Sequence, residues 1–412
     1  MSSTEVKGEG RPSEAAQPSA TLSTRAAMVI MYAQDGAGLG HMRRCANVAA
    51  AVTTRQEGAR VVIAGRSLAA AAAFELPPHC DVLKLPSFAQ LGDDASGERR
   101  VLADAEDAAF GRLRSRLLVD LVAELRPRAI LVDNEPRGLG GEMMAALTLA
   151  RREGLAGRIV CGLRDIRGRA DYVVPKWQRD GTAAALAELY DTVLVYGDPE
   201  FYDTRSEYGL GTTIAVDVVQ TGYLFDDQPR RSPETVRREL QLPEAAPIVA
   251  VTAGSGADGG RLLAMYLAEV AVRLPAAAVS VIVAGPLMPA AEFEALRRVG
   301  SGTCRVVRSY DNLSLVAAAS AVVCQAGYNS ILEATHLGHR PLVVPRQTRS
   351  GEQETRAEVF ARRGLCEVLL PDGLDAAALA RMVTSQLERP RASSSPFRPA
   401  ESAARAAELL LG

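Results

Sequence analysis

The stretch Ala321-Val322-Val323-Cys324-Gln325-Ala326-Gly327-Tyr328-Asn329-Ser330-Ile331-Leu332-Glu333 combines a short apolar run, a glycine-containing turn and the start of a helical pattern. The apolar run Ala321–Cys324 predicts a buried strand, and Ser330–Leu337 predicts a helix. The first N–H groups of such a helix have no partner within the helix and favour an anion. A strand that passes through a polar turn directly into a helix is the repeating unit of an α/β fold.

The same alternation of strand and helix extends in both directions from this stretch. Further strands are predicted at Ala27–Ala33, Arg60–Ala64, Ala129–Val132, Ile159–Leu163, Thr192–Tyr196, Val249–Thr252, Val279–Ala284, Arg305–Arg308 and Pro341–Val344. Helices are predicted between them, among them Met42–Glu57, Ala105–Leu125, Thr182–Tyr190 and Gly259–Arg273. Continuous apolar strands that alternate with helices predict parallel sheets covered on both faces.

The chain has 412 residues, enough for two domains, and the alternation breaks once, in a Pro-rich stretch before residue 247. We therefore predict an α/β protein of two Rossmann-like domains that face each other across a cleft. The predicted segments are a disordered extension (1–25), an N-terminal domain (26–223), a linker (224–246), a second domain (247–391) and a tail (392–412).

Composition excludes several classes of protein. The formal net charge of −2 argues against a nucleic-acid binder, which needs a basic excess. No apolar run reaches the ~18 residues of a membrane-spanning helix, and the N-terminus lacks the apolar core of a secretory signal. Six cysteines without a CxxC pair fit a reducing cytoplasm and argue against a zinc site. We expect a cytoplasmic protein without a metal site; peripheral membrane contact and a homodimer are compatible with the sequence.

A glycine-rich turn follows the first predicted strand, with Gly36, Gly38 and Gly40 at alternate positions and His41 directly after them. The glycines allow a tight turn and a close backbone approach to a ligand. A histidine near its ordinary pKa of ~6.5 can act as a base near neutral pH. The alternative is a turn that only packs a helix on the sheet, with His41 as a helix cap.

Charged residues also follow the other strands of the N-terminal half. Asp133 ends one strand, and Arg164 and Asp165 end the next. These groups could act as a base, orient His41 or hold an acceptor, or they could be solvated loop charges with capping roles. We assign His41 and Asp165 as candidate catalytic residues. The residues assigned to the acceptor side are Gly38, Gly40, Arg43, Asp133 and Arg164.

Three segments of the second half suit a sugar nucleotide. The turn Gly254-Ser255-Gly256 could hold a diphosphate through its N–H groups. Glu333, one turn into its helix, can accept hydrogen bonds from two adjacent ribose hydroxyls, or it could complete a capping box with Ser330. The loop after Pro341–Val344 carries many polar groups, and its arginines Arg346, Arg349 and Arg356 could bind phosphate or carboxylate or be solvated.

The run from Gly327 to Glu333, with Gly338-His339-Arg340-Pro341-Leu342-Val343-Val344-Pro345 and Glu352-Gln353 after it, resembles the C-terminal domain of glycosyltransferase family 28, the MurG-like enzymes. The resemblance implies that Glu333 binds the nucleotide ribose and that Gly254–Gly256 contacts the donor phosphates. It also implies that Glu352 and Gln353 contact the donor sugar. Glu352 departs from the amide that the family has at its position, so the resemblance leaves the sugar open.

The N-terminal half resembles the family less specifically. Gly38-Leu39-Gly40-His41 is similar to the family's glycine-rich turn, and Gly162–Ile166 and Val195–Pro199 are similar to a subgroup of bacterial family-28-like transferases. The resemblance covers roughly residues 27–390. It implies a GT-B fold without a metal requirement or a cofactor other than a nucleotide-sugar co-substrate, UDP- or dTDP-linked. The donor would bind the C-terminal domain, and the acceptor, a small-molecule natural product or a cell-envelope glycolipid, would bind the N-terminal domain. The final helix would cross back to the N-terminal domain.

The residues assigned to the donor are Gly254, Ser255, Gly256, Gln325, Gly327, Asn329, Ser330, Glu333, Glu352 and Gln353. Two other functions share the predicted architecture. One is a sugar-nucleotide 2-epimerase, which needs no acceptor, and the other is a catalytically silent partner of another transferase. The glycine turns and Glu333 argue against the silent partner, which has no need to keep them.

Overall fold

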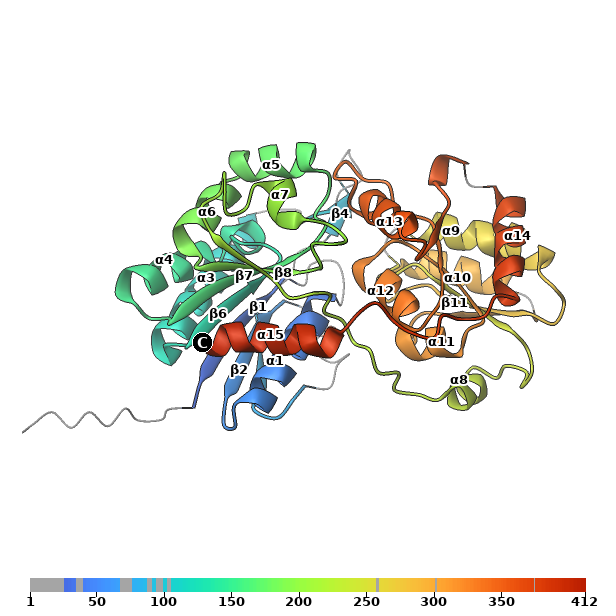
Figure 1. The fold of residues 1–412 in the computed structure, drawn as a ribbon, viewed down its shortest axis with the longest axis horizontal. Coiled ribbons are helices and arrows are strands. Elements are labelled where there is room, and N and C mark those ends of the chain that lie inside the picture. Colours follow the sequence, from blue (N-terminus) through green and yellow to red (C-terminus); the bar gives the residue numbers. More distant parts are fainter. Residues whose placement is uncertain are drawn as a thin grey trace, which may run out of the picture.

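The computed structural model describes residues 26–34, 40–66, 76–86, 91–93, 99–101, 105–256, 259–300, 302–373 and 375–412. Within these ranges the chain forms two α/β domains side by side, each built on a parallel sheet (Figure 1). The predicted α/β class and the two Rossmann-like domains are therefore confirmed. Predictions that concern residues 1–25, and Gly36 and Gly38 of the first glycine turn, lie outside the described residues.

The N-terminal sheet has the strand order β3-β2-β1-β6-β7-β8-β9, with every neighbouring pair parallel. Its strands are β1 Met28–Ala33, β2 Arg60–Gly65, β3 Cys80–Lys84, β6 Ala129–Asp133, β7 Arg158–Arg164, β8 Thr192–Tyr196 and β9 Asp217–Gln220. Its helices are α1 Gly40–Arg55, α3 Ala105–Leu125, the 3₁₀ turn η1 Leu139–Gly141, α4 Met144–Glu153, α5 Ala170–Arg179, α6 Thr182–Leu189 and α7 Thr204–Tyr208. The short strands β4 Leu91–Asp93 and β5 Arg99–Val101 form a separate antiparallel pair.

The C-terminal sheet has the order β12-β11-β10-β13-β14-β15 and is also parallel. Its strands are β10 Ile248–Thr252, β11 Val279–Val283, β12 Cys304–Val307, β13 Ala321–Cys324, β14 Leu342–Val343 and β15 Glu367–Val368. The helical elements from the linker onward are α8 Pro233–Glu239, α9 Gly260–Met265, the π turn η2 Tyr266–Val270, the 3₁₀ turns η3 Ala271–Arg273 and η4 Pro371–Gly373, α10 Ala290–Val299, α11 Asn312–Ala318, α12 Tyr328–His336, α13 Glu352–Arg362, α14 Ala376–Leu387 and α15 Pro399–Leu411.

Both sheets reverse their strand order at their first strand, and this feature places the candidate site. The order turns between β1 and β6 in one domain and between β10 and β13 in the other. The register pairs Ala33 with Asp133 and Thr252 with Cys324, so the strands of each pair end level with each other. Ligands of open α/β sheets bind beyond the strand ends at such reversals. The loops after these four strands are therefore the first place to look for a site.

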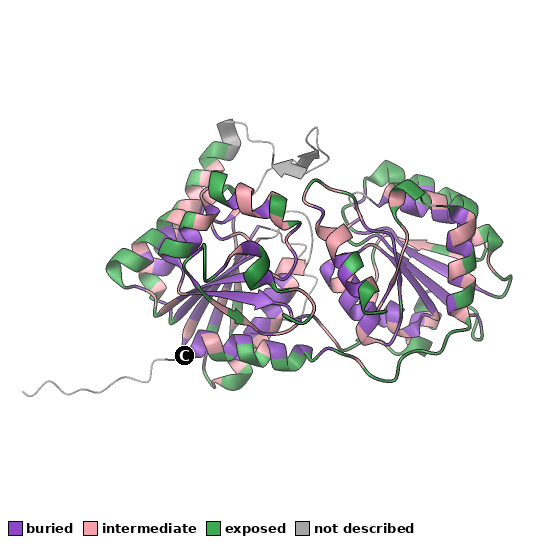
Figure 2. Cartoon of the chain, turned by 45° about the horizontal axis from the view of Figure 1, so that its top comes forward, coloured by how far each residue is buried: buried purple, intermediate pink, exposed green. Residues whose placement is uncertain are grey.

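Side chains that alternate along β1 fill two layers of the N-terminal domain. Val29 and Met31 pack with α1 and α15, whereas Ile30 and Tyr32 pack with α3 and α4 on the other face. In Figure 2 the strands of both sheets are buried, and the exposed residues lie on the outer faces of the helices. This two-sided burial explains why the strands are apolar without a polar alternation.

The core of one domain continues into the other. Ile248 and Ala250 of β10 belong to the same buried cluster as β1, α1 and α15, together with α11, α12 and α13. Val249 and Val251 face a separate cluster formed with α9, η2 and α14. One face of each sheet therefore contributes to a single hydrophobic core that crosses the domain boundary.

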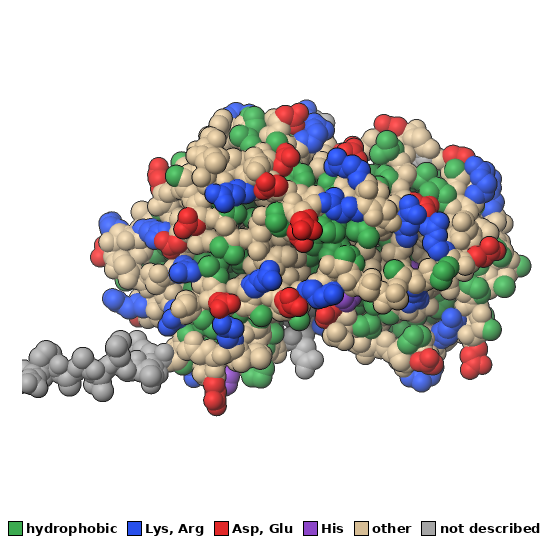
Figure 3. All heavy atoms as spheres, in the orientation of Figure 1, with side chains coloured by type: hydrophobic (Ala, Val, Ile, Leu, Met, Phe, Trp, Pro, Cys, Tyr) green, Lys and Arg blue, Asp and Glu red, His purple; other side chains and the backbone are tan. Residues whose placement is uncertain are grey.

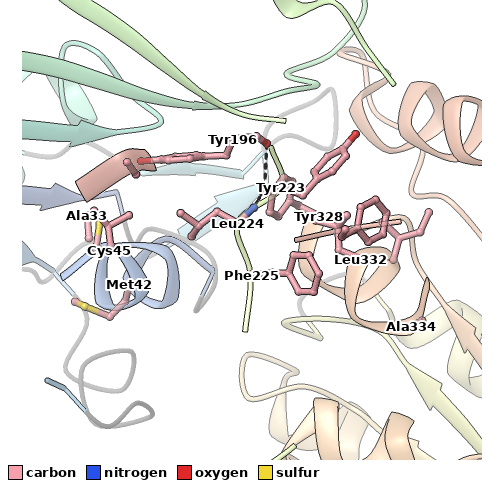
Figure 4. Close-up of a cluster of buried hydrophobic side chains, with 14 of the residues drawn as sticks. Ala33, Met42, Cys45, Tyr196, Tyr223, Leu224, Phe225, Tyr328, Leu332 and Ala334 are labelled. Carbon is pink, nitrogen blue, oxygen red and sulfur yellow. Dashed lines mark hydrogen bonds between the residues drawn. The ribbon is translucent and has the colours of Figure 1, made fainter. Parts of the chain in front are cut away.

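Six aromatic residues form the junction of the two domains, here called the aromatic hub: Phe201, Tyr223, Phe225, Tyr328, Phe360 and Phe397. The ring centroids of Tyr223 and Phe397 lie 5.1 Å apart, and that of Tyr223 lies 6.0 Å from Phe360. The hub contains side chains from the N-terminal domain, the segment after β9, the C-terminal domain and the segment before α15. Figure 4 shows three of them, Tyr223, Phe225 and Tyr328. Aromatic pairs at these distances and angles are favourable beyond their burial.

The final helix returns from the C-terminal domain to pack along α1 of the N-terminal domain (Figure 1). The carbonyl of Leu409 accepts a hydrogen bond from Arg158 Nη1 at 3.1 Å, and Glu408 pairs with Arg55 at 3.1 Å. The chain therefore crosses between the domains twice, once near residues 221–247 and once before α15. Two crossings limit the relative motion of the domains.

Several elements differ from the sequence-based predictions. The edge strands β3, β9 and β15 were not predicted, because they are short and mix polar with apolar residues. The predicted helix Gly259–Arg273 is divided into α9, η2 and η3. Among the described residues, no helix has the length and hydropathy needed to span a bilayer. Acidic and basic side chains are interspersed over the face shown in Figure 3.

The Tyr328 hydroxyl gives a direct test of the domain junction. It donates to the Tyr196 carbonyl at 3.0 Å and accepts from the Leu224 N–H at 3.0 Å, and all three groups are buried. Tyr328→Phe leaves that carbonyl and N–H unsatisfied, which we expect to destabilise the protein by about 1–3 kcal/mol. The measurement is the midpoint of urea unfolding.

Tyr310→Phe is the matched control, because the Tyr310 hydroxyl bonds to Glu239 at the surface. We expect this change to stay within about 0.5 kcal/mol of wild type. Equal midpoints for the two variants would contradict the role of Tyr328 at the junction.

Candidate active site between the two domains

His41 and Asp133 form a close pair at the reversal of the N-terminal sheet. His41 lies on the first turn of α1, Asp133 is the last residue of β6, and His41 Nδ1 lies 2.5 Å from Asp133 Oδ2. The Asp133 side chain is fully buried, while that of His41 is 16% exposed. Nδ1 also lies 2.8 Å from Arg44 Nη2. We assign the proton to Nδ1, because the carboxylate at 2.5 Å can only accept, and this assignment leaves the lone pair of the imidazole on Nε2. The pair can therefore take a proton from a ligand.

Arg44 completes the group. Its Nε donates to Asp133 Oδ1 at 3.1 Å and its Nη2 to Oδ2 at 2.9 Å, a two-point contact with the carboxylate. The guanidinium also lies over the rings of Tyr196 and Tyr328, 5.5 Å and 5.6 Å from their centroids. Arg44 thus neutralises a buried charge and links it to the domain junction.

The charges around His41 determine its protonation. Burial lowers the pKa of His41 to about 4; Asp133 opposes this decrease, and Arg44 and Arg164 add to it. Burial alone would raise the pKa of Asp133, but Arg44 and His41 outweigh it and hold this pKa at about 2. His41 is therefore neutral at neutral pH and becomes protonated only as the pH falls through about 4.

The loop after Asp133 is held by Arg167, which lies in the loop after β7. Asn134 has a left-handed backbone with φ of 70°, a conformation that asparagine tolerates better than most residues. Its side-chain oxygen accepts from Arg167, which also pairs with Glu135 at 2.7 Å. These contacts keep the end of β6, and with it Asp133, in one orientation.

Asp165 does not join this group. Its fully buried side chain faces Arg356 of α13, with a closest distance of 4.0 Å between Arg356 Nη2 and Asp165 Oδ1. Burial raises the pKa of Asp165, and Arg356 only partly offsets it. Of the two carboxylates considered from the sequence, Asp133 is the one that contacts His41, and Asp165 lies at the contact between the domains.

On the C-terminal side, α12 begins two residues before the predicted helix. Gly327 is its N-cap, without a side-chain hydrogen bond, and Asn329 and Ser330 lie within the first turn. The alternative in which Ser330 and Glu333 form a capping box is therefore wrong. Because no side chain caps it, this helix end keeps the partial positive charge that favours an anion.

Glu333 is engaged from both domains instead. Its Oε1 pairs with Arg43 of α1, and its Oε2 accepts from Asn312 Nδ2 at 2.6 Å. The Glu333 side chain is 1% exposed. Burial raises its pKa, while Arg43 and Asn312 counteract the increase. The residue that the sequence assigns to the ribose thus contacts Arg43, which the sequence assigns to the acceptor side.

The first turns of α1 and α12 lie against each other. A Cβ atom added to Gly40 would lie 3.1 Å from Asn329 Nδ2, so the absence of a side chain permits this approach. His41 and Arg43 extend from one of these turns, and Glu333 lies one turn into the other helix. The geometry brings the predicted acceptor and donor residues together at one place.

The turn Gly254–Gly256 follows β10, beside β13, so that it lies at the same sheet edge as Gln325 and Gly327. Gly254 and Gly256 have φ of 60° and 84°. A Cβ on Gly256 would clash with the carbonyl of Ala284, so only glycine fits there. The Gly256 N–H donates to the Ala253 carbonyl at 3.0 Å, which closes the turn at the end of β10.

The two residues assigned to the donor sugar have different environments. The Glu352 carboxylate pairs with Arg164 of β7 at 2.7 Å and with Arg356 at 3.1 Å. Burial raises its pKa, but Arg164 and Arg356 outweigh this effect and bring it to about 2. Gln353 Oε1 accepts the backbone N–H of Arg346 at 3.0 Å. Glu352 therefore carries its charge in a contact between the domains.

Two contributing residues, Arg44 and Asn312, were not recognised from the sequence as members of the site, and Arg356 was considered only as a phosphate or carboxylate ligand or a solvated group. Arg44 follows His41 by three residues and so shares its helix face, a spacing that could have indicated it. Asn312 has no comparable local signal, because it reaches Glu333 from another helix. Arg356 is buried and donates to the carbonyls of Ala326 and Ile166, both at 2.9 Å, so it is neither solvated nor placed as a simple phosphate ligand.

A recess lies elsewhere in the N-terminal domain. It has a volume of about 520 Å³ and is lined by residues of α5, α6 and α7, including Val174, Gln178 and Ala184. None of its lining residues belongs to the group around His41 and Glu333. In the described part of the chain, no three His, Cys, Asp or Glu side chains are grouped as metal ligands.

Residues 291–410 match the model of the glycosyltransferase family 28 C-terminal domain. A curated relative, an uncharacterized glycosyltransferase of Methanopyrus kandleri, is 28% identical over 231 residues, which are 55% of this chain and 62% of the relative. The match therefore spans less than two thirds of that relative's length.

Solved structures of GT-B enzymes share the whole architecture. The calicheamicin glycosyltransferase CalG4 aligns with a TM-score of 0.55 and 16% identity, over 94% of this chain and 96% of that chain. MurG of Acinetobacter baumannii aligns with a TM-score of 0.52 and 14% identity, over 93% of this chain and 95% of that chain. A putative UDP-N-acetylglucosamine 2-epimerase of Listeria monocytogenes aligns with a TM-score of 0.59 and 13% identity, over 92% of this chain and 94% of that chain. At these identities the likeness establishes the GT-B fold.

The protonation of His41 can be measured by NMR through its Cε1–H signal, assigned with a His41→Gln variant. We expect the wild-type residue to titrate at about pH 4. Arg44→Met removes a cation that lowers this pKa and leaves Asp133 unneutralised, so the pKa should rise. Arg55→Met, on the same helix, serves as the control and should leave it unchanged. An unchanged pKa in Arg44→Met would contradict the described charge arrangement.

Proposed function

We propose that this protein is a glycosyltransferase that moves a sugar from a nucleotide diphosphate to an acceptor hydroxyl. The observation that supports it most is the meeting of two groups at one place between the domains. One is the His41–Asp133 pair, a candidate base, and the other is the uncapped end of α12 with Glu333, a candidate nucleotide site. A base beside a donor site is what transfer to a hydroxyl requires.

The donor in this proposal is a UDP- or dTDP-sugar bound mainly by the C-terminal domain. Glu333 accepts hydrogen bonds from the ribose hydroxyls. The diphosphate lies at the N-terminus of α12 and the Gly254–Gly256 turn, with Ser255 and Ser330 in reach, and the sugar lies toward Glu352 and Gln353. Helix N–H groups and arginines then stabilise the leaving diphosphate, the role for which other transferases use a metal ion.

The transfer step is a single displacement. His41 Nε2 takes the proton of the acceptor hydroxyl, and the acceptor oxygen attacks the anomeric carbon. The bond from that carbon to the diphosphate oxygen breaks, and the electron pair leaves with the nucleoside diphosphate. Asp133 stabilises the imidazolium that forms, and Arg44 holds Asp133. Because the pKa of His41 lies at about 4, we expect the acid limb of kcat/KM near that pH.

The acceptor is proposed to bind the N-terminal domain near His41, as a small-molecule natural product or a cell-envelope glycolipid, in a cytoplasmic reaction. A sugar-nucleotide 2-epimerase is the competing function, because one solved neighbour carries that name on the same fold. The two differ in their need for an acceptor. Incubation with UDP-sugars alone separates them: an epimer as product would favour the epimerase.

Nucleotide binding is the first test. Thermal shift with UDP, dTDP, GDP and ADP should show stabilisation by at least one of them, and we expect UDP or dTDP. At 100 times its Kd a ligand stabilises the folded protein by about 2.7 kcal/mol, which is readily detected. No shift with any of the four would contradict the proposal.

Two substitutions test the assigned roles in the transfer reaction. Glu333→Ala removes charged hydrogen bonds to the ribose, so the donor KM should rise about 10- to 100-fold. His41→Ala removes the base, so kcat should fall by about 10²–10⁴ with little change in donor KM.

The matched controls are Glu294→Ala, in an exposed pair on α10, and His79→Ala, an exposed histidine. Both should keep wild-type kinetics. Unchanged donor KM in Glu333→Ala would remove the ribose assignment, and near wild-type kcat in His41→Ala would exclude His41 as the base.

A further inference from the structure

Arg43 is the arginine that joins the first turn of α1 to the candidate ribose site. It lies on α1 between His41 and Arg44, yet its guanidinium leaves the N-terminal domain and pairs with Glu333 of α12. Arg43 is 20% exposed and Glu333 1% exposed, so the more accessible partner of this pair is the cation. The pair therefore joins a partly exposed arginine to a buried carboxylate.

The proposed donor has to reach a carboxylate whose side chain is only 1% exposed and whose nearest cation is Arg43. Glu333 Oε2 is already engaged by Asn312 at 2.6 Å, and Oε1 is engaged by Arg43. Ribose hydroxyls that donate to Glu333 compete with the guanidinium for the same oxygen. A guanidinium that leaves a buried carboxylate needs another anion, because an uncompensated charge at such a site is costly.

The donor brings that anion with it. The diphosphate is joined to the ribose through C5′, so it lies next to the group that contacts Glu333. The N-terminus of α12 is uncapped, and Gly40 lies against Asn329 in its first turn. Arg43 follows Gly40 by one helical turn, which places its side chain beside this end of α12.

The neighbouring arginines are fixed by other contacts. Arg44 binds both oxygens of Asp133, Arg164 pairs with Glu352, and Arg356 donates to two backbone carbonyls. A guanidinium matches the geometry of a phosphate and holds its charge at any relevant pH. Arg43 is therefore the arginine best placed to change partner.

We propose that Arg43 pairs with Glu333 in the empty enzyme and moves to the donor diphosphate when the ribose binds Glu333. In the loaded enzyme it stabilises the negative charge that the departing nucleoside diphosphate gains as the bond to the sugar breaks. A residue of the N-terminal domain would then contact the leaving group held by the C-terminal domain. This inference rests on the proposed transferase function and extends it.

The test compares a nucleoside with its diphosphate. Calorimetric titration of UDP and uridine, and of dTDP and thymidine, gives the ratio of the nucleoside Kd to the diphosphate Kd. Arg43→Gln removes the competitor for Glu333 and the partner of the diphosphate together. We expect the nucleoside to bind as tightly as or more tightly than in wild type, and the ratio to fall at least tenfold.

Arg43→Lys and Arg55→Gln complete the design. Lysine keeps the positive charge and should restore part of the ratio. Arg55 lies on the same helix and pairs with Glu408 at its far end, so Arg55→Gln should keep the wild-type ratio. A role limited to stability would change unfolding without changing the ratio.

Two results would overturn the inference, and only the second would also contradict the proposed function. If wild type binds UDP or dTDP and Arg43→Gln leaves the ratio unchanged, the exchange of partners is wrong while the proposed function remains. If wild type binds no nucleoside diphosphate, the proposed function fails and the inference fails with it.

Discussion

The candidate site depends on one electrostatic constraint, the burial of the Asp133 carboxylate at the end of β6. A fully buried charge must be paired, and Arg44 pairs it through two hydrogen bonds while His41 contacts the same carboxylate. Both partners come from the first turns of α1, so the constraint fixes the register of that helix against the sheet. It also fixes the imidazole tautomer that leaves Nε2 available. The same turn carries Arg43, whose contact with Glu333 therefore follows from where Asp133 holds α1.

Two kinds of contact join the domains, and they contribute differently. The aromatic hub and the shared core bury apolar surface, which stabilises the closed arrangement. The ion pairs Arg43–Glu333 and Arg164–Glu352 cross the same boundary. Buried ion pairs add little net stability, because desolvation offsets their attraction. The two ion pairs determine which charged side chains of the two domains are in contact. Their arginines can exchange a carboxylate for an anionic ligand when such a ligand binds. In a nucleotide-sugar transferase, this arrangement would keep the donor residues ordered before the donor binds.

The sequence predicted much of this fold because the strands are apolar and the turns between strand and helix are rich in glycine. β8 and β13 match their predicted bounds, and α12 differs by two residues at its start. The edge strands were missed because β9 alternates exposed and half-buried residues and lacks a continuous apolar run. Within the site, the sequence identified His41, Arg43, Asp133 and Glu333 but neither Arg44 nor Asn312. The contacts Glu333–Asn312 and Arg356–Ile166 join residues far apart in the chain, so no local pattern indicates them. Arg44 differs, because it shares a helix face with His41.

A crystal structure of the protein with UDP or dTDP bound would test the central claim most directly. We predict the ribose hydroxyls on Glu333, the diphosphate between the first turns of α1 and α12, and the Arg43 guanidinium on a phosphate oxygen. His41 would remain paired with Asp133, with Nε2 directed toward the place of the sugar. A nucleotide bound elsewhere, for example in the recess of α5, α6 and α7, with the Arg43–Glu333 pair intact, would contradict it.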